Sequence, residues 1–437
     1  MFHKILLGFA LLSPFCDAIC WRNTSSEQIR RLNENSVKYC IANCLGLTSL
    51  KTNKTKSCQF DSSSGRVQGC ERNYSFMQGK SKFKVFCNME TEWNFSLTTD
   101  TPQTSLCDVI VINIAVFNSS TNEMNAVPNR IAGATSQIKL AKKLGVKVLF
   151  KVGSWDEFIM HPRAITKLAS DNNAQTAKFI KSITTLINQF DLDGVFFSWI
   201  WPGCPQATCV NDIERKKIPE FIQSLARPLK DNGQLFVYFI HGSNAKVALT
   251  PGDYFTDIVD VVDYFAFESP TQSGEWSPNA DLNFNLKKSK EVLSEYFAKI
   301  KSPRFKSKIV MYMESSFPNF ELSGAPIKLG GPQLINSKIK RRLEITDWCK
   351  RVRDISYDVF RNPETQNYAV KGNTLFAFDD VESMKAKINY LKSFGSGVYI
   401  TEVQYDDQAG ECGCGKMPFL KMVVNMLTMN CDPSPCF

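Results

Sequence analysis

The stretch Phe190-Asp-Leu-Asp-Gly-Val-Phe-Phe-Ser-Trp-Ile-Trp-Pro-Gly203 decides the fold that we predict. It begins with a short β-rich run, and it is one of several such runs that are mostly separated by amphipathic helical stretches. Strands that alternate with helices favour a parallel sheet covered by helices. The eight predicted strands are 83–89, 108–116, 146–152, 192–198, 235–240, 261–267, 308–313 and 397–401.

The number of strands favours one architecture over another. Eight strands close a (β/α)8 barrel, whose site lies at the carboxyl ends of the strands. The alternative, a doubly wound open sheet, prefers a glycine-rich phosphate-binding turn after its first strand. Residues 88–93 read Asn-Met-Glu-Thr-Glu-Trp and contain no glycine. We therefore predict an α/β fold of the (β/α)8 TIM-barrel type, with helices at 138–144, 176–189, 218–229, 286–300 and 381–394.

The gap between the seventh and eighth predicted strands, 314–396, is far longer than a usual connection. It contains several glycines, a helical stretch that ends near Arg353 and the β-like run 373–378. We predict a small α+β insertion between strands 7 and 8, at about 317–380.

The chain start predicts a compartment. Residues 1–18 combine Lys4, an apolar run and the small residue Ala18, as a secretory signal does. Cleavage after Ala18 would leave 14 of the 15 cysteines, an even number suited to disulfides. No later stretch is long and uncharged enough to span a bilayer. We predict a secreted, extracellular glycoprotein with sequons at Asn23, Asn53, Asn73, Asn94 and Asn118.

Residues 19–82 differ from the rest of the chain, because they hold eleven Lys or Arg against four Asp or Glu and five of the cysteines. We predict four parts: a signal peptide at 1–18, a Cys-rich basic N-terminal module at 19–82, a barrel domain at 83–430 and a Cys-containing tail at 431–437. The basic module could attract anionic glycans or acidic protein surfaces; the alternative is a solvated cationic face. We expect no nucleic-acid partner, no cofactor and, with three histidines, no metal site.

Around the opening stretch the chain resembles the glycoside hydrolase family 18 chitinases and chitinase-like lectins. Their fourth strand carries D-G-x-D-x-D-x-E followed by an aromatic residue and Pro, and Asp193-Gly194 and Trp201-Pro202 keep this frame. Further matching motifs follow in the family's order over about four-fifths of the chain, at 85–87, 106–108, 152–155, 378–387, 406–407 and 412–419. Motifs in the right order indicate this family more strongly than any single one.

The resemblance also implies what the chain lacks. In this family the substrate's own acetamido group attacks the anomeric carbon, the last carboxylate of the motif protonates the leaving oxygen, and the Asp two residues before it stabilises the ring intermediate. The three aligned positions here are Phe196, Ser198 and Ile200, and none can ionise. General acid–base catalysis contributes about 10² to 10⁴-fold. We therefore predict a pseudoenzyme.

Other aligned positions differ as well. The family's M-x-Y-D becomes Phe265-Ala-Phe267-Glu268, the tryptophan under the sugar becomes Thr401, and a third-strand serine becomes Lys151. We predict that Phe196, Phe197 and Ile200 fill the barrel mouth as core; the alternative is an apolar ligand site. The candidate ligand cleft consists of Trp155, Trp201, Glu268, Trp276 and Thr401. The tryptophans could stack on sugar or serve as structural packing.

The resemblance implies the disulfides Cys87–Cys107 and Cys349–Cys412. Cys204 and Cys209 are a candidate pair for a small loop across the mouth. The sequence leaves open how the remaining eight pair: Cys20, Cys40, Cys44, Cys58, Cys70, Cys414, Cys431 and Cys436. At the exit of the eighth strand, Glu402, Asp406 and Asp407 are predicted to be structural and to cap the last helix.

Together these patterns predict a secreted, non-hydrolytic protein that binds chitin, N-acetylglucosamine-type glycans or a protein receptor. One alternative is a weak glycoside hydrolase that uses Glu268, the surviving acid aligned with a family site residue. Another is a purely structural extracellular protein.

Overall fold

The computed structural model describes thirteen segments of the chain: 60–61, 66–67, 82–89, 104–153, 164–170, 174–199, 212–242, 252–269, 277–323, 328–334, 342–352, 354–413 and 415–429. The chain divides into two compact units, Met1–Asn73 and Tyr74–Phe437. In the first unit, the structure describes the antiparallel pair β1 (Phe60–Asp61) and β2 (Arg66–Val67). The predicted signal segment 1–18, most of the module 19–82 and the tail 431–437 lie outside the described residues.

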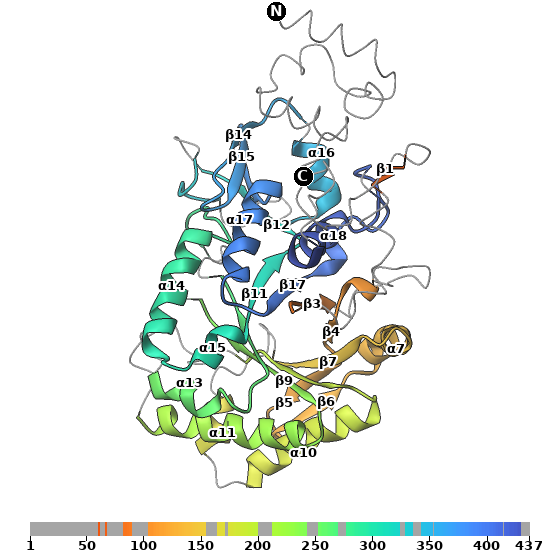
Figure 1. Ribbon diagram of the computed structural model, residues 1–437, viewed down its shortest axis with the longest axis vertical. Coiled ribbons are helices and arrows are strands. Elements are labelled where there is room, and N and C mark those ends of the chain that lie inside the picture. Colours follow the sequence, from red (N-terminus) through yellow and green to blue (C-terminus); the bar gives the residue numbers. More distant parts are fainter. Residues whose placement is uncertain are drawn as a thin grey trace, which may run out of the picture. The chain divides into compact units, whose positions relative to one another are not determined.

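The second unit contains a closed barrel of eight parallel strands, which confirms the predicted fold (Figure 1). Around the barrel each strand pairs with its neighbours in chain order, and the last strand pairs with the first. In chain order these strands are β3 (Lys84–Met89), β4 (Val109–Ile112), β7 (Lys147–Val152), β8 (Gly194–Phe197), β9 (Leu235–Ile240), β10 (Tyr264–Phe267), β11 (Ile309–Glu314) and β17 (Gly397–Thr401).

Helices follow most of the barrel strands in the chain, as the sequence pattern predicts. They are α7 (Pro128–Lys143), α9 (Ala164–Ser170), α10 (Ala174–Gln189), α11 (Asp212–Asp231), α13 (Gly252–Ile258), α14 (Leu286–Lys299), α15 (Pro303–Ser307), α17 (Val381–Lys392) and α18 (Pro418–Val424). Short helical turns occur at Thr104–Leu106, Val403–Tyr405 and Asn425–Met429.

The predicted strand 108–116 is not one strand, so this prediction was wrong in detail. After β4 the chain leaves the barrel and forms a separate antiparallel hairpin of β5 (Ala115–Asn118) and β6 (Glu123–Ala126). Its turn is stabilised locally, because the Asn118 side chain accepts hydrogen bonds from the amides of Ser120 and Thr121 at 2.9 and 3.3 Å. The apolar run continues through the break, so hydrophobicity alone did not reveal it.

Between β11 and β17 lies the inserted α+β substructure that the long gap predicts. Its five-stranded antiparallel sheet has the order β13-β12-β16-β15-β14. The elements are β12 (Phe317–Glu321), β13 (Arg342–Leu343), α16 (Ile345–Val352), β14 (Asp358–Phe360), β15 (Asn367–Lys371) and β16 (Thr374–Phe378).

Two glycines are required where barrel strands come closest to each other. A Cβ atom on Gly194 would lie 2.0 Å from the carbonyl oxygen of Leu235, and one on Gly397 would lie 2.0 Å from that of Lys84. Both distances are far below van der Waals contact, so a side chain at either position would force the strands apart. Gly194 belongs to the Asp-Gly pair that keeps the frame of the opening stretch.

The structure contains the disulfides Cys87–Cys107 and Cys349–Cys412, which are the two pairs that the resemblance implies. Near the second bond, Asp406 accepts hydrogen bonds from the amides of Phe419 and Leu420 in the first turn of α18. This confirms the predicted capping of the last helix for Asp406, because these amides have no partner within the helix. The prediction was wrong for Asp407, whose carboxylate accepts hydrogen bonds from the amides of Gly410, Glu411 and Cys412, and for Glu402, which pairs with Arg342. No described helix is both long and apolar enough to cross a membrane.

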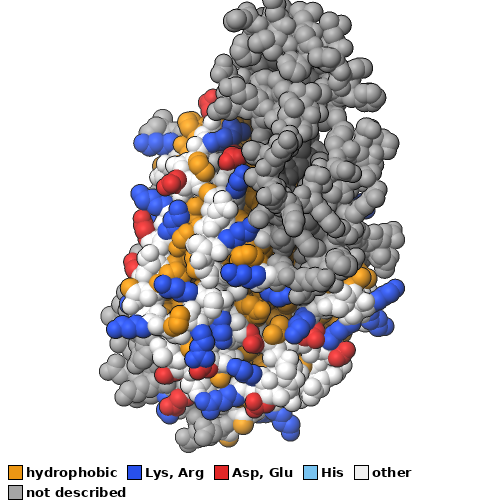
Figure 2. Space-filling model, viewed as in Figure 1, with side chains coloured by type: hydrophobic (Ala, Val, Ile, Leu, Met, Phe, Trp, Pro, Cys, Tyr) orange, Lys and Arg blue, Asp and Glu red, His pale blue; other side chains and the backbone are white. Residues whose placement is uncertain are grey.

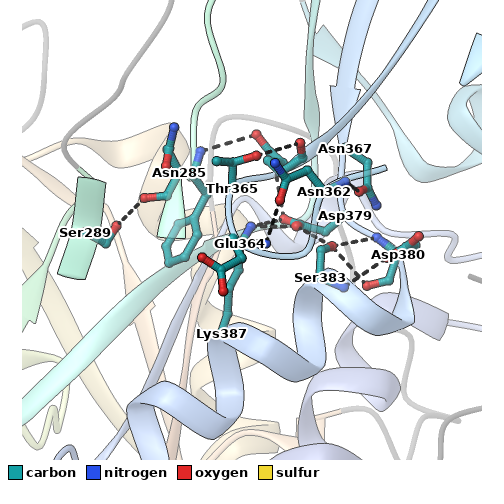
Figure 3. Close-up of polar contacts among 12 residues, drawn as sticks. Asn285, Ser289, Asn362, Glu364, Thr365, Asn367, Asp379, Asp380, Ser383 and Lys387 are labelled. Atoms are coloured by element: carbon teal, nitrogen blue, oxygen red, sulfur yellow. Dashed lines mark hydrogen bonds and ion pairs between the residues drawn. The ribbon is translucent and has the colours of Figure 1, made fainter. Parts of the chain in front are cut away.

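A buried ion pair joins α17 to the end of the inserted sheet (Figure 3). The Lys387 side chain is 0% exposed, and its Nζ lies 2.5 and 2.7 Å from the two carboxylate oxygens of Asp379. Gln366 and Ser383 also donate hydrogen bonds to this carboxylate, and Lys387 Nζ lies 4.3 Å from the ring centroid of Phe284. Burial lowers the pKa of Lys387, although Asp379 opposes this shift.

Replacing Asp379 with Asn should destabilise the fold strongly, because it leaves the Lys387 ammonium buried without its counter-charge. Breaking a buried ion pair costs about 3–5 kcal/mol of unfolding free energy. Urea denaturation followed by intrinsic fluorescence measures the change. The matched control is Asp354→Asn, whose partner Lys371 is exposed, and it should unfold at the wild-type urea concentration. Equal midpoints for both variants would contradict a structural role for the buried pair.

Candidate functional site

The carboxyl ends of the barrel strands carry a ring of polar side chains. Pairing between neighbouring strands places Lys151 of β7 beside Phe196 of β8, and Glu314 of β11 beside Thr401 of β17. His241 and Glu268 directly follow β9 and β10. Because these side chains end neighbouring parallel strands, they surround the barrel mouth, where sites of this fold form.

The wall that β8 contributes to the barrel interior is not ionisable in the described residues. Phe196 is 0% exposed, and its ring stacks on that of Tyr399 from β17 with centroids 4.6 Å apart. The Ser198 hydroxyl donates a hydrogen bond to the carbonyl of Gly153. Ile200 lies outside the described residues. An aromatic ring and a hydroxyl bound to backbone thus occupy positions where the resemblance places carboxylates.

Phe197 and Phe267 do not line the mouth. Phe197 packs against Phe221 of α11, with ring centroids 6.3 Å apart, and Phe267 packs against Tyr296 of α14 at 6.4 Å. The prediction that Phe197 fills the mouth was therefore wrong. Alternation along a strand explains this, because a residue next to an inward-facing one points at the helices.

Glu268 is a partly buried acid at the mouth. Its side chain is 16% exposed, and Oε2 lies 3.3 Å from Nε2 of His241. Among the described residues, this oxygen has no hydrogen bond of good geometry. Burial, and to a smaller extent Glu314, raise the pKa of Glu268 to about 8, while Lys151 opposes the shift. At neutral pH Glu268 can therefore hold a proton and donate a hydrogen bond.

The sequence reading missed a charged network beside Glu268. The guanidinium of Arg342, from β13 of the insertion, lies 3.1 Å from Glu314 and 3.2 Å from Glu402. Ser316 donates a hydrogen bond to Glu402 at 2.7 Å, and Asn283 donates one to Glu314 at 3.2 Å. Although burial opposes it, the two glutamates hold the pKa of Arg342 above its usual range. In the sequence, this network is indicated only by acids at the strand ends: Glu314 ends β11, and Glu402 directly follows β17.

The remaining predicted site residues are placed as follows. Thr401 is half-buried, and its hydroxyl lies 3.5 Å from the carbonyl of Met313. Of the sequons, Asn118 ends β5 at the hairpin turn and is half-buried. The other predicted residues lie outside the described part of the chain: Trp155, Trp201, Trp276, Cys204, Cys209, Asn23, Asn53, Asn73 and Asn94.

The described residues of the barrel mouth can bind a polar ligand and can hold a proton. They offer a protonatable acid at Glu268, a neighbouring imidazole and an ammonium group at Lys151. Glu314 and Glu402, by contrast, share the single guanidinium of Arg342 as their ion-pair partner. Within the described residues, no group of histidine, cysteine, aspartate and glutamate side chains is arranged to hold a metal ion.

Comparison with known proteins supplies a family. Residues 87–406 match the family model described as glycosyl hydrolases family 18. Probable chitinase 10 of Drosophila melanogaster is 22% identical over 377 residues, which are 78% of this chain but only 16% of that protein's length.

Solved structures agree with the fold. Catalytic domain 2 of the Ostrinia furnacalis Group II chitinase superposes with a TM-score of 0.68 at 20% identity, covering 81% of this chain and 98% of that one. Human YKL-39, a pseudo-chitinase with retained chitooligosaccharide binding properties, superposes with a TM-score of 0.65 at 19% identity, covering 79% and 99%.

The raised pKa of Glu268 makes a pH-dependent stability difference testable. The group titrates near 4.5 when exposed and near 8 in the fold, so between these values the unfolded chain has lost a proton that the folded chain keeps. Wild-type stability contributed by this group therefore falls as pH rises from about 4.5 to 8. Glu268→Gln removes this pH dependence. As pH rises from 4.5 to 8, the unfolding free energy of the variant should therefore increase relative to that of the wild type, by on the order of 4 kcal/mol.

Urea denaturation at several pH values between 4.5 and 8 measures this gain. Glu411→Gln, which removes an exposed carboxylate paired with Lys350, is the control and should follow the wild-type profile. A constant difference between Glu268→Gln and the wild type at all pH values would contradict the raised pKa.

Proposed function

The chain belongs to glycosyl hydrolases family 18, and from this premise we propose that it is a secreted pseudoenzyme that binds chitooligosaccharides without hydrolysing them. The proposal rests chiefly on the β8 wall. Phe196 and Ser198 stand where the family pattern places two of its acids, Phe196 is fully buried against Tyr399, and the Ser198 hydroxyl is engaged with the carbonyl of Gly153. Ile200 stands at the position of the proton donor.

Loss of these acids removes the groups needed for hydrolysis but leaves the barrel fold in place. A hydroxyl and a hydrocarbon side chain cannot protonate a leaving oxygen at neutral pH, and they cannot balance a cationic ring intermediate. A ligand can still contact the strand ends, because binding needs hydrogen-bond partners and ring surfaces rather than a proton donor. We propose that Glu268, Thr401, Trp155, Trp201 and Trp276 contribute to this ligand site.

The retained binding of human YKL-39 supports the choice of ligand. Here the sugar would meet Glu268 as a hydrogen-bond donor at neutral pH, because its pKa is raised to about 8. The charged network of Arg342 lies beside it and offers further polar contacts. Thr401 has no ring on which a sugar can stack, so we expect binding to be weaker than in a site with a tryptophan there.

The sequence supports the rest of the proposal. Residues 1–18 would be removed as a signal peptide, and at least two of the five sequons would carry glycans on the secreted protein. We propose the module 19–82, the barrel domain 83–430 and the tail 431–437 as the parts of the mature chain, with anionic glycans as partners of the basic module. A protein receptor or a purely structural role are the alternative uses of the same scaffold.

One observation favours a second candidate function, a weak glycoside hydrolase that uses Glu268. A carboxyl group with a pKa near 8 is protonated at neutral pH, as a general acid must be, and His241 lies 3.3 Å from it. The β8 wall offers no second carboxylate in the described residues. We therefore rank this candidate below binding without hydrolysis.

Two measurements on the secreted protein test the proposal. Release of a fluorophore from a labelled chitooligosaccharide should not exceed the buffer rate for the wild type or for Glu268→Gln. Calorimetric titration with chitopentaose should show saturable binding that Glu268→Ala, which removes the hydrogen-bonding group, weakens about tenfold, the effect of losing about 1.4 kcal/mol. Glu411→Ala is the control and should leave binding unchanged.

The other outcomes separate the alternatives. Turnover by the wild type that Glu268→Gln abolishes would establish the hydrolase. Absence of both turnover and binding would contradict the proposal and favour a structural or receptor-binding role.

A further inference from the structure

A strongly basic surface lies on the helices α14 and α15, outside the barrel mouth. Residues 286–308 contain eight Lys or Arg but only two Asp or Glu. This excess of six positive charges lies within 23 residues, whereas the whole chain carries a formal charge of +9. Figure 2 shows Lys and Arg side chains alternating with hydrophobic side chains over the face that these helices form.

Part of this charge is already neutralised within the fold. Lys288 pairs with Asp281 at 3.2 Å, and Arg304 pairs with Asp260 at 2.7 Å. Lys308 donates hydrogen bonds to the carbonyls of Val259 and Val262, and its ammonium is partly buried. These three side chains therefore serve the fold.

Four other lysines of this face, Lys287, Lys290, Lys301 and Lys306, have no carboxylate within ion-pair distance among the described residues. Three of them are exposed and Lys290 is half-buried. Over the 14 residues of α14, which is about 21 Å long, unpaired positive charge thus lies near both ends of the helix.

Half-buried aromatic rings connect two of these lysines. Lys290 Nζ lies 5.5 Å from the ring centroid of Tyr390 on α17, and Tyr390 contacts Phe394 at 4.9 Å. Phe394 contacts Phe297 of α14 at 5.2 Å, and Lys306 Nζ lies 4.8 Å from the centroid of Phe297. We call these five residues the lysine–aromatic ladder. Lys290 and Phe297, which are seven apart on α14, share a helix face, and Phe394 follows the C-cap of α17 directly. This placement explains why the ladder is continuous.

We propose that the lysine–aromatic ladder and the unpaired lysines around it bind a sulfated polysaccharide. Sulfate groups fit the exposed ammonium groups by charge, and ring surfaces between two cations suit the apolar faces of sugar rings. A lipid surface fits less well, because the large hydrophobic side chains that are exposed in the described residues are Leu334, Ile355 and Phe360, and none belongs to these helices. This site is separate from the proposed chitooligosaccharide site, and it does not involve the N-terminal module.

Immobilised heparin is the probe, and the full-length secreted protein is the analyte, at about 0.15 M salt, where exposed charges separated by more than about 8 Å are screened. The double variant Lys290→Gln/Lys306→Gln should bind heparin about tenfold more weakly, because it removes two ammonium contacts to the polysaccharide. The matched control Lys350→Gln/Lys371→Gln removes two lysines that pair with Glu411 and Asp354. It should bind within twofold of the wild type.

Competition experiments identify the class of ligand that binds the lysine–aromatic ladder. Soluble heparin should displace the protein, whereas desulfated heparin, phosphatidylserine vesicles and duplex DNA should not do so at equal charge concentration. Thermal unfolding of both double variants verifies that they are folded. Equal heparin affinity of the two double variants would overturn the site, and equal competition by vesicles or DNA would overturn the choice of a sulfated polysaccharide.

Discussion

Closure of the barrel is the constraint on which the rest of this structure depends. When β17 pairs with β3, each strand has two parallel neighbours, and every second side chain must point into a crowded interior. Gly397 permits this closure, because its strand runs against the carbonyl of Lys84 with no room for a side chain. The same geometry fixes which residue of each strand reaches the mouth. A change of residue type there alters chemistry without altering the fold.

The ionisable groups described at the mouth of this barrel lie on strands other than β8. The β8 wall presents Phe196 and Ser198, whereas the acids Glu268, Glu314 and Glu402 follow or end the strands β10, β11 and β17. Arg342 reaches them from the inserted sheet, so a residue of the insertion determines the charge balance of the barrel mouth. The insertion and the barrel thus form one electrostatic unit.

Sequence reasoning recovered the features that depend on periodicity and on motif order. Eight β-rich runs separated by helices predicted the barrel, and the long gap before the last strand predicted the insertion. Sequence reasoning did not recover the contacts of Arg342 with Glu314 and Glu402. These residues lie 28 and 60 positions from Arg342, and no repeating pattern relates them to it. The orientation of Phe197 and the break after Ile112 were also missed. Both depend on which residue of an apolar run faces inward, and an apolar residue suits either face.

The disulfide between Cys349 and Cys412 spans 63 residues and encloses α17 and β17 within one covalent loop. Proteins can dimerise by exchanging a terminal element between two copies, and a closing strand near the chain end is a natural candidate for such an exchange. Here β17 cannot leave its own barrel as a free end, because both of its flanks are anchored to the same molecule. While this bond is intact, the last strand cannot exchange by itself between two copies, because the segment that follows it is tied to α16 of its own molecule.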